Sequence, residues 1–441
     1  MSITFSNESN TVLNRIANRR LANSFSKIKF MYRDVDWSAI STQHVGIYIH
    51  VPFCEQLCAF CPFHKVRYRE DLKDRYLQAI ETEIHRRGVE GQVEWVYIGG
   101  GTPNLLSPAE IGRILDALRE HVSLASIGME GNPLQFTQDY LHEIRDLGVE
   151  KLSTGVESLK PDTLAHINRA KADEARIQAL IDQARDLGFT VNVDLMVGLP
   201  KQLPDDFLYD IDRVGIINPH QITTYPFMEI PGVQVTPEMK SREMFDLIEQ
   251  ADGVLAQYGY DRENVWVFSK TKKIYDSARD ELVIDYLGFG AAAFSKVGGA
   301  QVVNPPLALY LDMLQNGTAM GFCATVDESS EHWRRFGHEL YNLQLNPQVI
   351  EKMPRSIKFV LRLLKLAGHI KGYRVTPKGR FFVHDLTKTI VESLPFPVNN
   401  PAAVANFEDY QQRYLTAHTL LNQRAKSLHP PDSLLVTKVN Q

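Results

Sequence analysis

Apolar, β-branched stretches alternate with helical patterns from Val45 to Gln257. Each stretch is followed by residues with apolar positions at helical spacing, the longest being Glu70–Arg87 and Glu238–Gln257. Parallel neighbours need helical crossovers, so this alternation predicts a parallel α/β sheet covered by helices. There are six such units, fewer than the eight of a closed barrel. The predicted strands are Val45–Val51, Glu94–Ile98, Ile127–Glu130, Lys151–Gly155, Thr190–Val197 and Gln221–Tyr225.

Three of the four cysteines follow the first predicted strand, as Cys54, Cys58 and Cys61 in a C-x3-C-x2-C run. Pro52 ends the strand, so the run reads as a loop at its carboxyl end. Thiolates held this close together select soft metals or iron–sulfur centres. Three ligands for a four-iron cluster would leave one iron open to bind another molecule.

Two alternatives to a cluster exist for these cysteines. A disulfide with one spare thiol needs an oxidising compartment, and the N-terminus lacks the apolar core of a signal peptide. A structural zinc needs four ligands, and His50 or His64 could complete a Cys3His site. Cys323 is far away in the sequence and has no CxxC partner.

The segment Tyr48-x-His50-x-Pro52-Phe53-Cys54 and the cysteine run resemble the opening motif of the oxygen-independent coproporphyrinogen III oxidase-like family of radical S-adenosylmethionine (SAM) enzymes. The resemblance extends to about Ser295 and implies a partial (β/α)6 barrel. It also implies a [4Fe–4S] cluster on Cys54, Cys58 and Cys61, whose open iron binds SAM. Reductive cleavage of that SAM would yield a 5′-deoxyadenosyl radical, which needs a dry, enclosed site.

By the same resemblance, further residues are expected at two SAM sites. Gly99-Gly-Gly-Thr-Pro103 matches the family's GGGTP motif, although glycines there could simply make a tight turn, and Glu130 could simply cap a helix. Glu157 stands where the family usually has Gln, which can donate as well as accept. The expected first-SAM residues are Tyr48, Phe60, Gly100, Glu130 and Phe294, and the expected second-SAM residues are Gly101, Thr102, Glu157, Arg169 and Asp194.

Two departures from the family pattern bear on the reaction. Porphyrinogen-oxidising members typically carry another cysteine where this chain has Phe63, and the heme chaperones carry an HNxxYW motif where this chain has no His-Asn. The leading hypothesis is therefore an enzyme that uses a second SAM to methylate or cyclopropanate an unsaturated carbon. One alternative is a tetrapyrrole enzyme, for porphyrinogen decarboxylation or heme ring opening. The other is a non-enzymatic heme-binding trafficking protein with His50, His64, His338 and His369 as possible axial ligands.

The chain divides into three predicted parts: an N-terminal helical arm (1–44), the radical SAM barrel (45–327) and a small, mainly helical, winged-helix-like C-terminal cap (328–441). The cap is suggested by a helix at Ile357–Ala367 followed by a hairpin-like stretch to Arg380. The alternative, a DNA-reading winged helix, is disfavoured because the basic residues are few.

Whole-chain properties limit the partners. The net charge is −5, which gives no nucleic-acid footprint, and no apolar run reaches the roughly 18 residues of a membrane span. We therefore expect a cytoplasmic protein with a small unsaturated or tetrapyrrole substrate. A flavodoxin or ferredoxin is the expected electron donor.

Overall fold

The structure is a computed structural model, and it describes residues 16, 28–39, 43–270, 285–393, 396–398 and 404–428. Most of the predicted N-terminal helical arm (1–44), including the helix expected near Thr11–Phe25, therefore lies outside the described residues. The described part of the predicted arm includes a strand instead, β1 (Met31–Asp34), which pairs antiparallel with β15 (Met320–Thr325).

Six neighbouring parallel strands form the centre of the sheet, in the order β2-β5-β6-β7-β8-β9. They are the six predicted strands, with ends that differ by a few residues, so the predicted α/β architecture is confirmed. Their burial is nearly continuous because helices cover the sheet. The strands are β2 (His44–Val51), β5 (Gln92–Gly100), β6 (Ile127–Gly131), β7 (Val149–Glu157), β8 (Thr190–Val197) and β9 (Gln221–Pro226).

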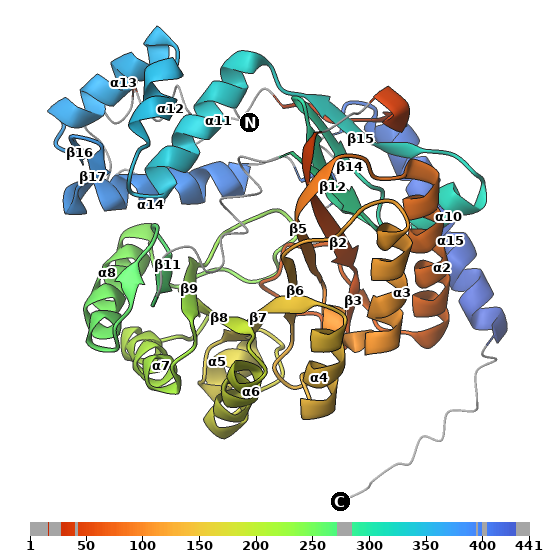
Figure 1. Ribbon diagram of the computed structural model, residues 1–441, viewed down its shortest axis with the longest axis horizontal. Helices are drawn as coiled ribbons and strands as arrows, with labels where there is room; N and C mark the ends of the chain where they lie inside the picture. The colour runs from red at the N-terminus through yellow and green to blue at the C-terminus, as the bar shows by residue number, and fades with distance from the viewer. Residues whose placement is uncertain are drawn as a thin grey trace, which may run out of the picture.

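Crossover helices follow these strands along the outer side of the curved sheet (Figure 1). Polar side chains cap several of them: Ser107 and Glu110 form a capping box at the start of α3, and Thr137 and Asp173 cap α4 and α6. The helices are α2 (Glu70–Arg87), α3 (Pro108–Arg119), α4 (Gln138–Asp146), α5 (Pro161–His166), α6 (Glu174–Asp186), α7 (Pro204–Ile217) and α8 (Ser241–Gln257).

The sheet does not close on itself. Beside β2 lies β12 (Tyr286–Phe289), parallel to it, followed by the antiparallel strands β13 (Phe294–Val297), β14 (Ala300–Val303), β15 and β1. At the other edge β9 pairs antiparallel with β11 (Val267–Ser269), which pairs with β10 (Asp261–Arg262). The described residues thus form an open, partial barrel with antiparallel edges.

The C-terminal lobe consists of α11 (Glu328–Tyr341), α12 (Pro347–Lys352), α13 (Arg355–Leu366), the hairpin β16–β17 (Ile370–Lys371 and Arg374–Val375) and α14 (Pro377–Ser393). This order of helices and hairpin is the predicted winged-helix-like cap. The last helix, α15 (Phe407–Leu428), does not pack with it. Instead α15 packs on α10 (Leu307–Gln315), and the Tyr410 ring contacts Tyr32 and Phe322, so α15 covers the antiparallel edge (Figure 1).

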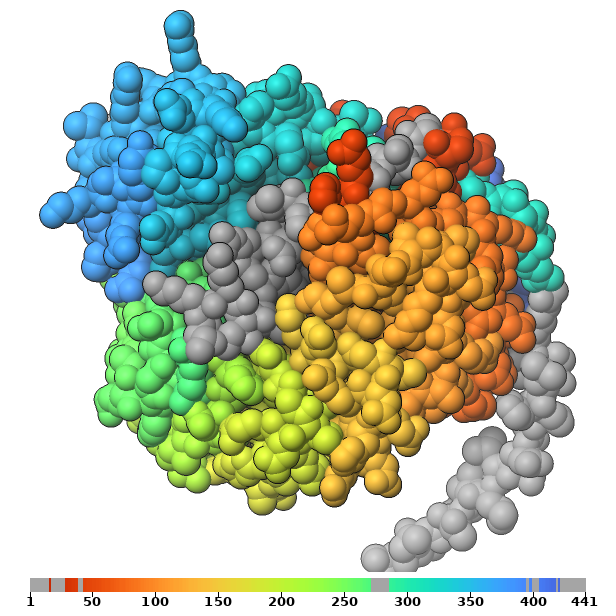
Figure 2. All heavy atoms as spheres, viewed as in Figure 1, coloured from red at the N-terminus to blue at the C-terminus, as the bar shows by residue number. Residues whose placement is uncertain are grey.

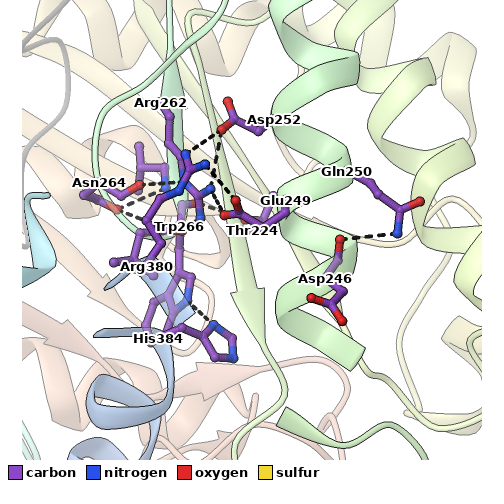
Figure 3. A network of polar contacts seen from close by, with 12 residues as sticks. Thr224, Asp246, Glu249, Gln250, Asp252, Arg262, Asn264, Trp266, Arg380 and His384 are labelled. Atoms are coloured by element: carbon purple, nitrogen blue, oxygen red, sulfur yellow. Dashed lines mark hydrogen bonds and ion pairs between the residues drawn. The ribbon is translucent and has the colours of Figure 1, made fainter. Parts of the chain in front are cut away.

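Four charged side chains join the lobe to the barrel. Arg262 of β10 and Arg380 of α14 both bind Glu249 and Asp252 of α8, and Arg380 lies 2.8 Å from Glu249 and 3.0 Å from Asp252 (Figure 3). Nearby, Nε1 of Trp266 donates to Nδ1 of His384, 3.1 Å away. We call the four charged residues the junction network.

Candidate active site

The cysteine loop leaves the carboxyl end of β2 and is tied at its base. Strand β3 (Phe53–Cys54) pairs with β4 (Val66–Arg67), the Val66 amide donates to the Pro52 carbonyl at 2.7 Å, and the Tyr68 amide donates to the Cys54 carbonyl at 2.8 Å. The three cysteines therefore belong to one closed loop beside the centre of the sheet.

All three loop cysteines are free thiols, with Cys54 buried and Cys58 and Cys61 partly buried. The Thr102 hydroxyl lies 3.5 Å from the Cys54 sulfur, and Nη1 of Arg169 lies 3.6 Å from the Cys58 sulfur. Burial raises the pKa of Cys54 to about 11 and also raises that of Cys61. A bound metal centre would replace these protons, since the thiolate is the ligand.

The sulfur positions favour a polynuclear cluster over zinc. Tetrahedral zinc brings its thiolates to about 3.8 Å from one another. Among the described residues, however, the group of candidate ligand atoms that all lie within 4.8 Å of one another is Glu70, Asp74 and Glu110, and the three cysteines do not form such a group. Lys73 lies at that acidic group and forms ion pairs with all three carboxylates.

The two histidines considered as a fourth zinc ligand have other partners. Nδ1 of His50 is 2.8 Å from the Tyr48 hydroxyl, and Nε2 of His50 is 3.0 Å from the His64 carbonyl oxygen. Nε2 of His64 accepts from the Leu307 amide at 3.1 Å. Burial lowers the pKa of His50 to about 4 and that of His64 to about 3, so both are neutral and support the loop.

The predicted glycine segment packs directly against the cysteine loop. The Gly101 amide donates to the Val51 carbonyl at 2.7 Å, and a Cβ on Gly101 would lie 2.6 Å from the Phe53 carbonyl oxygen. Gly100 has φ +117°, and a Cβ there would lie 2.8 Å from the His50 ring. Close approach and backbone conformation both require glycine here.

Glu130 ends β6 and reaches back to β5. Its carboxylate accepts from the Gly100 amide at 2.5 Å and from the Tyr97 hydroxyl at 3.2 Å. Burial raises its pKa to about 7, and the charge of Asp194 adds to the shift. The Glu130 side chain thus holds the glycine segment in place and does not cap a helix.

The other residues expected at the first SAM are only partly brought together. The Tyr48 ring stacks with Tyr97 at 6.4 Å, which places it beside Glu130. Phe60 is partly buried and packs against the main hydrophobic core. Phe294 has a different environment: its ring lies 6.2 Å from Phe396 and packs with the cluster around Phe322.

Glu157 and Arg169 meet at the end of β7. Nη2 of Arg169 lies 3.5 Å from Oε1 of Glu157 and also donates to the Gly155 carbonyl. Glu157 has φ +65°, an uncommon conformation for a side chain of this kind. Burial raises the pKa of Glu157 to about 7, although the Arg169 charge opposes that shift.

Asp194 lies on β8 opposite Gly155 of β7, so it adjoins the same strand end. Its carboxylate accepts from the Ser153 hydroxyl at 2.7 Å and from the Asn192 side chain at 2.9 Å. Burial raises the pKa of Asp194 to about 6. Thr102 contacts Cys54 and Gly101 packs on the loop, so the second-SAM set faces the cysteines from two sides.

Sequence reasoning missed three supporting residues. Asn192 shares a strand face with Asp194, a period-2 signal that the sequence does contain. Asn104 binds both the amide and the carbonyl of Asn132, which locks the glycine segment to the loop after Glu130. Asp210, fully buried on α7, accepts from the Ser158 hydroxyl at 2.6 Å and the Leu159 amide at 3.1 Å. It thereby fixes the backbone just after Glu157.

The resulting site has an excess of negative charge. Glu130 and Glu157 lie at the carboxyl ends of β6 and β7, and Asp194 lies within the adjacent strand β8. Within the part of the chain that the structure describes, their one ion pair is Glu157 with Arg169. Partly buried carboxylates without matching cations are costly unless a ligand supplies positive charge. A sulfonium or ammonium group fits this requirement.

Comparison with known proteins agrees with this geometry. The radical SAM superfamily pattern matches residues 48–214. The oxygen-independent coproporphyrinogen III oxidase of Escherichia coli is 29% identical over 388 residues, covering 78% of this chain and 84% of that protein. The heme chaperone HemW of Bacillus subtilis is 28% identical over 290 residues, 60% of this chain and 75% of that protein. The structure of the E. coli oxidase, described as a radical SAM enzyme, superposes with a TM-score of 0.70 at 26% identity, covering 82% and 94% of the two chains.

The matched pattern, the cysteine loop and the partial barrel together define a radical SAM domain, and this chain contains one over residues 48–214. The chain as a whole is similar to the oxygen-independent coproporphyrinogen III oxidases and to the heme chaperones. Its cofactors are therefore a [4Fe–4S] cluster and SAM. The three free thiols of one loop fit the cluster, and the negatively charged strand ends fit a cationic SAM.

Proposed function

We propose that this chain is a radical SAM enzyme that acts on a tetrapyrrole and binds a second SAM at Glu157, Arg169 and Asp194. The observation that carries the second site is the excess of carboxylates beside the cysteine loop. The tetrapyrrole comes from the relatives, which are named as coproporphyrinogen III oxidases and heme chaperones. When bound, the cluster and its SAM supply the 5′-deoxyadenosyl radical.

The residues of the chain have distinct proposed roles around the two SAM molecules. Glu130 holds the glycine segment and so shapes the first SAM site. Asp194 and Glu157 accept hydrogen bonds from ribose hydroxyls and offset positive charge, while Arg169 suits the methionine carboxylate because its guanidinium can donate two parallel bonds. Binding of that carboxylate would compete with the present Arg169–Glu157 pair.

For the reaction, the first candidate is transfer of a one-carbon unit from the second SAM to an unsaturated tetrapyrrole carbon. Phe63 favours it, since the porphyrinogen-oxidising members typically have a cysteine at this position. The Phe63 side chain is 57% exposed, so it is not needed as packing for the core. This candidate joins the methyl-transfer hypothesis to a tetrapyrrole acceptor.

The second candidate is oxidative decarboxylation of a porphyrinogen. The similarity to the E. coli oxidase, which extends over 84% of that protein, favours it. The adenosyl radical would abstract a hydrogen atom from a propionate side chain. The resulting substrate radical would then lose carbon dioxide and pass one electron to an external one-electron acceptor, leaving a vinyl group, and no one-carbon unit would leave the second SAM.

A heme-trafficking role is less well supported by the histidines. His50, His338 and His369 are 3%, 4% and 5% exposed, and His64 accepts from a backbone amide. An axial ligand must reach the iron of a large planar ligand. A residue outside this set would therefore have to provide the axial ligand, and it could be a histidine, cysteine, methionine or tyrosine.

The test is an anaerobic assay of the reconstituted, reduced protein with SAM and either heme or coproporphyrinogen III. One-carbon transfer predicts 5′-deoxyadenosine together with S-adenosylhomocysteine and a heavier tetrapyrrole. Decarboxylation predicts 5′-deoxyadenosine and carbon dioxide without S-adenosylhomocysteine. Fewer than two SAM bound per chain at saturation, or no product from either tetrapyrrole, would contradict the proposal.

Asp194→Asn is the matched variant, since the amide keeps the shape of the side chain and removes its charge. We expect it to weaken binding of the second SAM while 5′-deoxyadenosine formation from the first continues. Lys201→Ala is the control, because this exposed residue pairs with Glu238 on the surface.

A further inference from the structure

The C-terminal lobe contains an uninterrupted basic segment, so the expectation that its basic residues are few is wrong for residues 352–384. Between residues 352 and 384 there are nine Lys and Arg and no Asp or Glu, in a chain whose 53 acids outnumber its 48 bases. Arg380 belongs to the junction network, and the other eight define what we call the basic surface. They are Lys352, Arg355, Lys358, Arg362, Lys365, Lys371, Arg374 and Lys378.

Helix α13 presents half of these bases on one face. Its bases recur at spacings of three and four residues, from Arg355 to Lys365, which places them on one side of a helix. The opposite side is buried against the lobe through Ile357, Val360, Leu361 and Leu364. The strict separation of the two sides means that the basic face points away from the protein.

Contacts join the helix, the hairpin and α14 into one surface. Nζ of Lys365 lies 4.8 Å from the centre of the Tyr373 ring in the hairpin, and Nζ of Lys378 donates to the Ala367 carbonyl at 2.9 Å. The eight bases form no ion pair with any residue that the structure describes. Their charge is therefore not neutralised within the described lobe.

Large apolar side chains are exposed within the same surface. Leu366 is 80% exposed, Phe359 is 48% exposed and Tyr373 is 41% exposed. Phe359 and Leu366 are seven residues apart on α13, so they lie on the same side as Arg355 and Arg362. Exposed apolar residues interleaved with cations are typical of surfaces that enter the headgroup region of a bilayer.

We propose that the basic surface docks this protein on an anionic lipid bilayer. Cations attract the headgroups, and Phe359, Leu366 and Tyr373 insert between them. The binding is peripheral, because no helix among the described residues is long and apolar enough to cross a membrane. The inference rests on the lobe alone and does not depend on the proposed function.

A nucleic acid is the competing partner, since α12, α13 and the hairpin have the order of a winged helix. Phosphate binding explains the cations, but it does not explain why Leu366 and Phe359 face water in the middle of them. A bilayer explains both. The lobe is also well placed for docking: α13 and the hairpin lie at the outer end of the molecule, away from the crossover helices, and the lobe protrudes in the space-filling view (Figures 1 and 2).

The experiment is cosedimentation of the full-length chain with vesicles of phosphatidylcholine alone or mixed with phosphatidylglycerol. We expect binding to the anionic vesicles only, and weaker binding as salt is added. The triple variant Arg355→Gln/Arg362→Gln/Lys365→Gln should lower the partition coefficient by roughly a hundredfold, from the usual contribution of each base near an anionic surface. The control Lys201→Gln should leave it unchanged.

The double variant Phe359→Ser/Leu366→Ser distinguishes membrane binding from nucleic-acid binding. Both side chains are exposed enough for the fold to survive their replacement. The double variant should weaken vesicle binding and leave the circular dichroism melt unchanged. The proposal would be overturned in favour of nucleic acid by the following result. The wild-type chain binds a random DNA duplex but not vesicles, the triple variant loses this DNA binding, and the double variant keeps it. Failure to bind either vesicles or duplex would overturn it outright.

Discussion

The strand-end site and the junction network use the same residue types in opposite ways. At the junction two arginines face two carboxylates, and each arginine contacts both acids (Figure 3). At the cysteine-loop site, by contrast, three carboxylates have one ion pair among the described residues, that of Glu157 with Arg169. A balanced set stabilises a packing arrangement, whereas an unbalanced one stores unfavourable charge until a ligand arrives.

The environment of each acid reflects this difference. Burial raises the pKa of Glu130 and Glu157 to about 7 and that of Asp194 to about 6. Perturbed groups of this kind gather at functional sites because the fold holds them there for the ligand. At the junction, Glu249 and Asp252 both pair with Arg262, whose side chain is only 5% exposed. Charge balance, more than burial, thus distinguishes the site from the scaffold.

The largest effect is expected at the cysteine loop, where a substitution should abolish cluster binding and SAM cleavage but leave the fold intact. Cys58→Ala removes one of the three proposed cluster ligands, so the reconstituted protein should lack a stable four-iron cluster and form no 5′-deoxyadenosine. The melting temperature of the apo chain should stay within about 4 °C of the wild type, since Cys58 is not a core residue. Iron content, product analysis and calorimetry measure these. Cys323→Ala, outside the loop on β15, is the control and should keep its iron.

The junction should behave in the reverse way. Arg262→Met leaves Glu249 and Asp252 with Arg380 alone, and breaking a buried pair costs about 3–5 kcal/mol. The free energy of unfolding in denaturant should fall by that amount, while iron content at low temperature stays normal. Adding Glu249→Met should recover part of the loss, because the excess acid is removed. An undisturbed stability in the single variant would show that the network is not structural.

Stability against pH sharpens the comparison at the site. A raised pKa means that the folded state favours the protonated acid, so this contribution is complete below pH 3.8 for Asp194 and is lost as pH rises through about 6. The buried histidines act oppositely: a lowered pKa at His50, His64 and His384 makes stability fall as pH drops below 6.5. Only a difference between variants therefore isolates Asp194.

At pH 8, Asp194→Asn should raise the free energy of unfolding of the apo protein above that of the wild type, by at most about 3 kcal/mol. This difference should shrink as the pH is lowered towards 4. Denaturant titrations of both proteins at several pH values measure the difference. Saturating SAM should stabilise the wild type more than the variant at pH 8. If the two proteins had the same free energy of unfolding at every pH, then the folded protein would not disfavour the charged form of the Asp194 carboxylate.

The sequence was most informative where structure is local. The six parallel strands were predicted to within a few residues, and the site acids could be proposed because Glu130 and Glu157 lie where strands end and Asp194 interrupts an apolar strand. The antiparallel edges were not found, since their strands are only two to six residues long and β1 pairs with a strand nearly three hundred residues away. Phe294 illustrates the limit: its motif suggested the SAM site, but its ring packs with Phe396.

Asp210 and Asn104 could not be found for a different reason. Each lies outside a strand end and acts through hydrogen bonds to backbone or hydroxyl groups of a distant loop. Such partners carry no periodic or compositional signal in one sequence. They set the conformation of Glu157 and of the glycine segment, so the positioning of the site depended on contacts that only the three-dimensional arrangement reveals.

The smallest effect is expected for an exposed pair of the same chemistry. Lys201 and Glu238 lie 3.0 Å apart, with their side chains 59% and 55% exposed, and such pairs contribute about 0–1 kcal/mol because water and salt screen them. Lys201→Ala should thus change the free energy of unfolding by less than about 1 kcal/mol, and added salt should remove even that difference. If it cost as much as Arg262→Met, then distance rather than burial and charge balance would govern these pairs. The contrast drawn between junction and site would then have no basis.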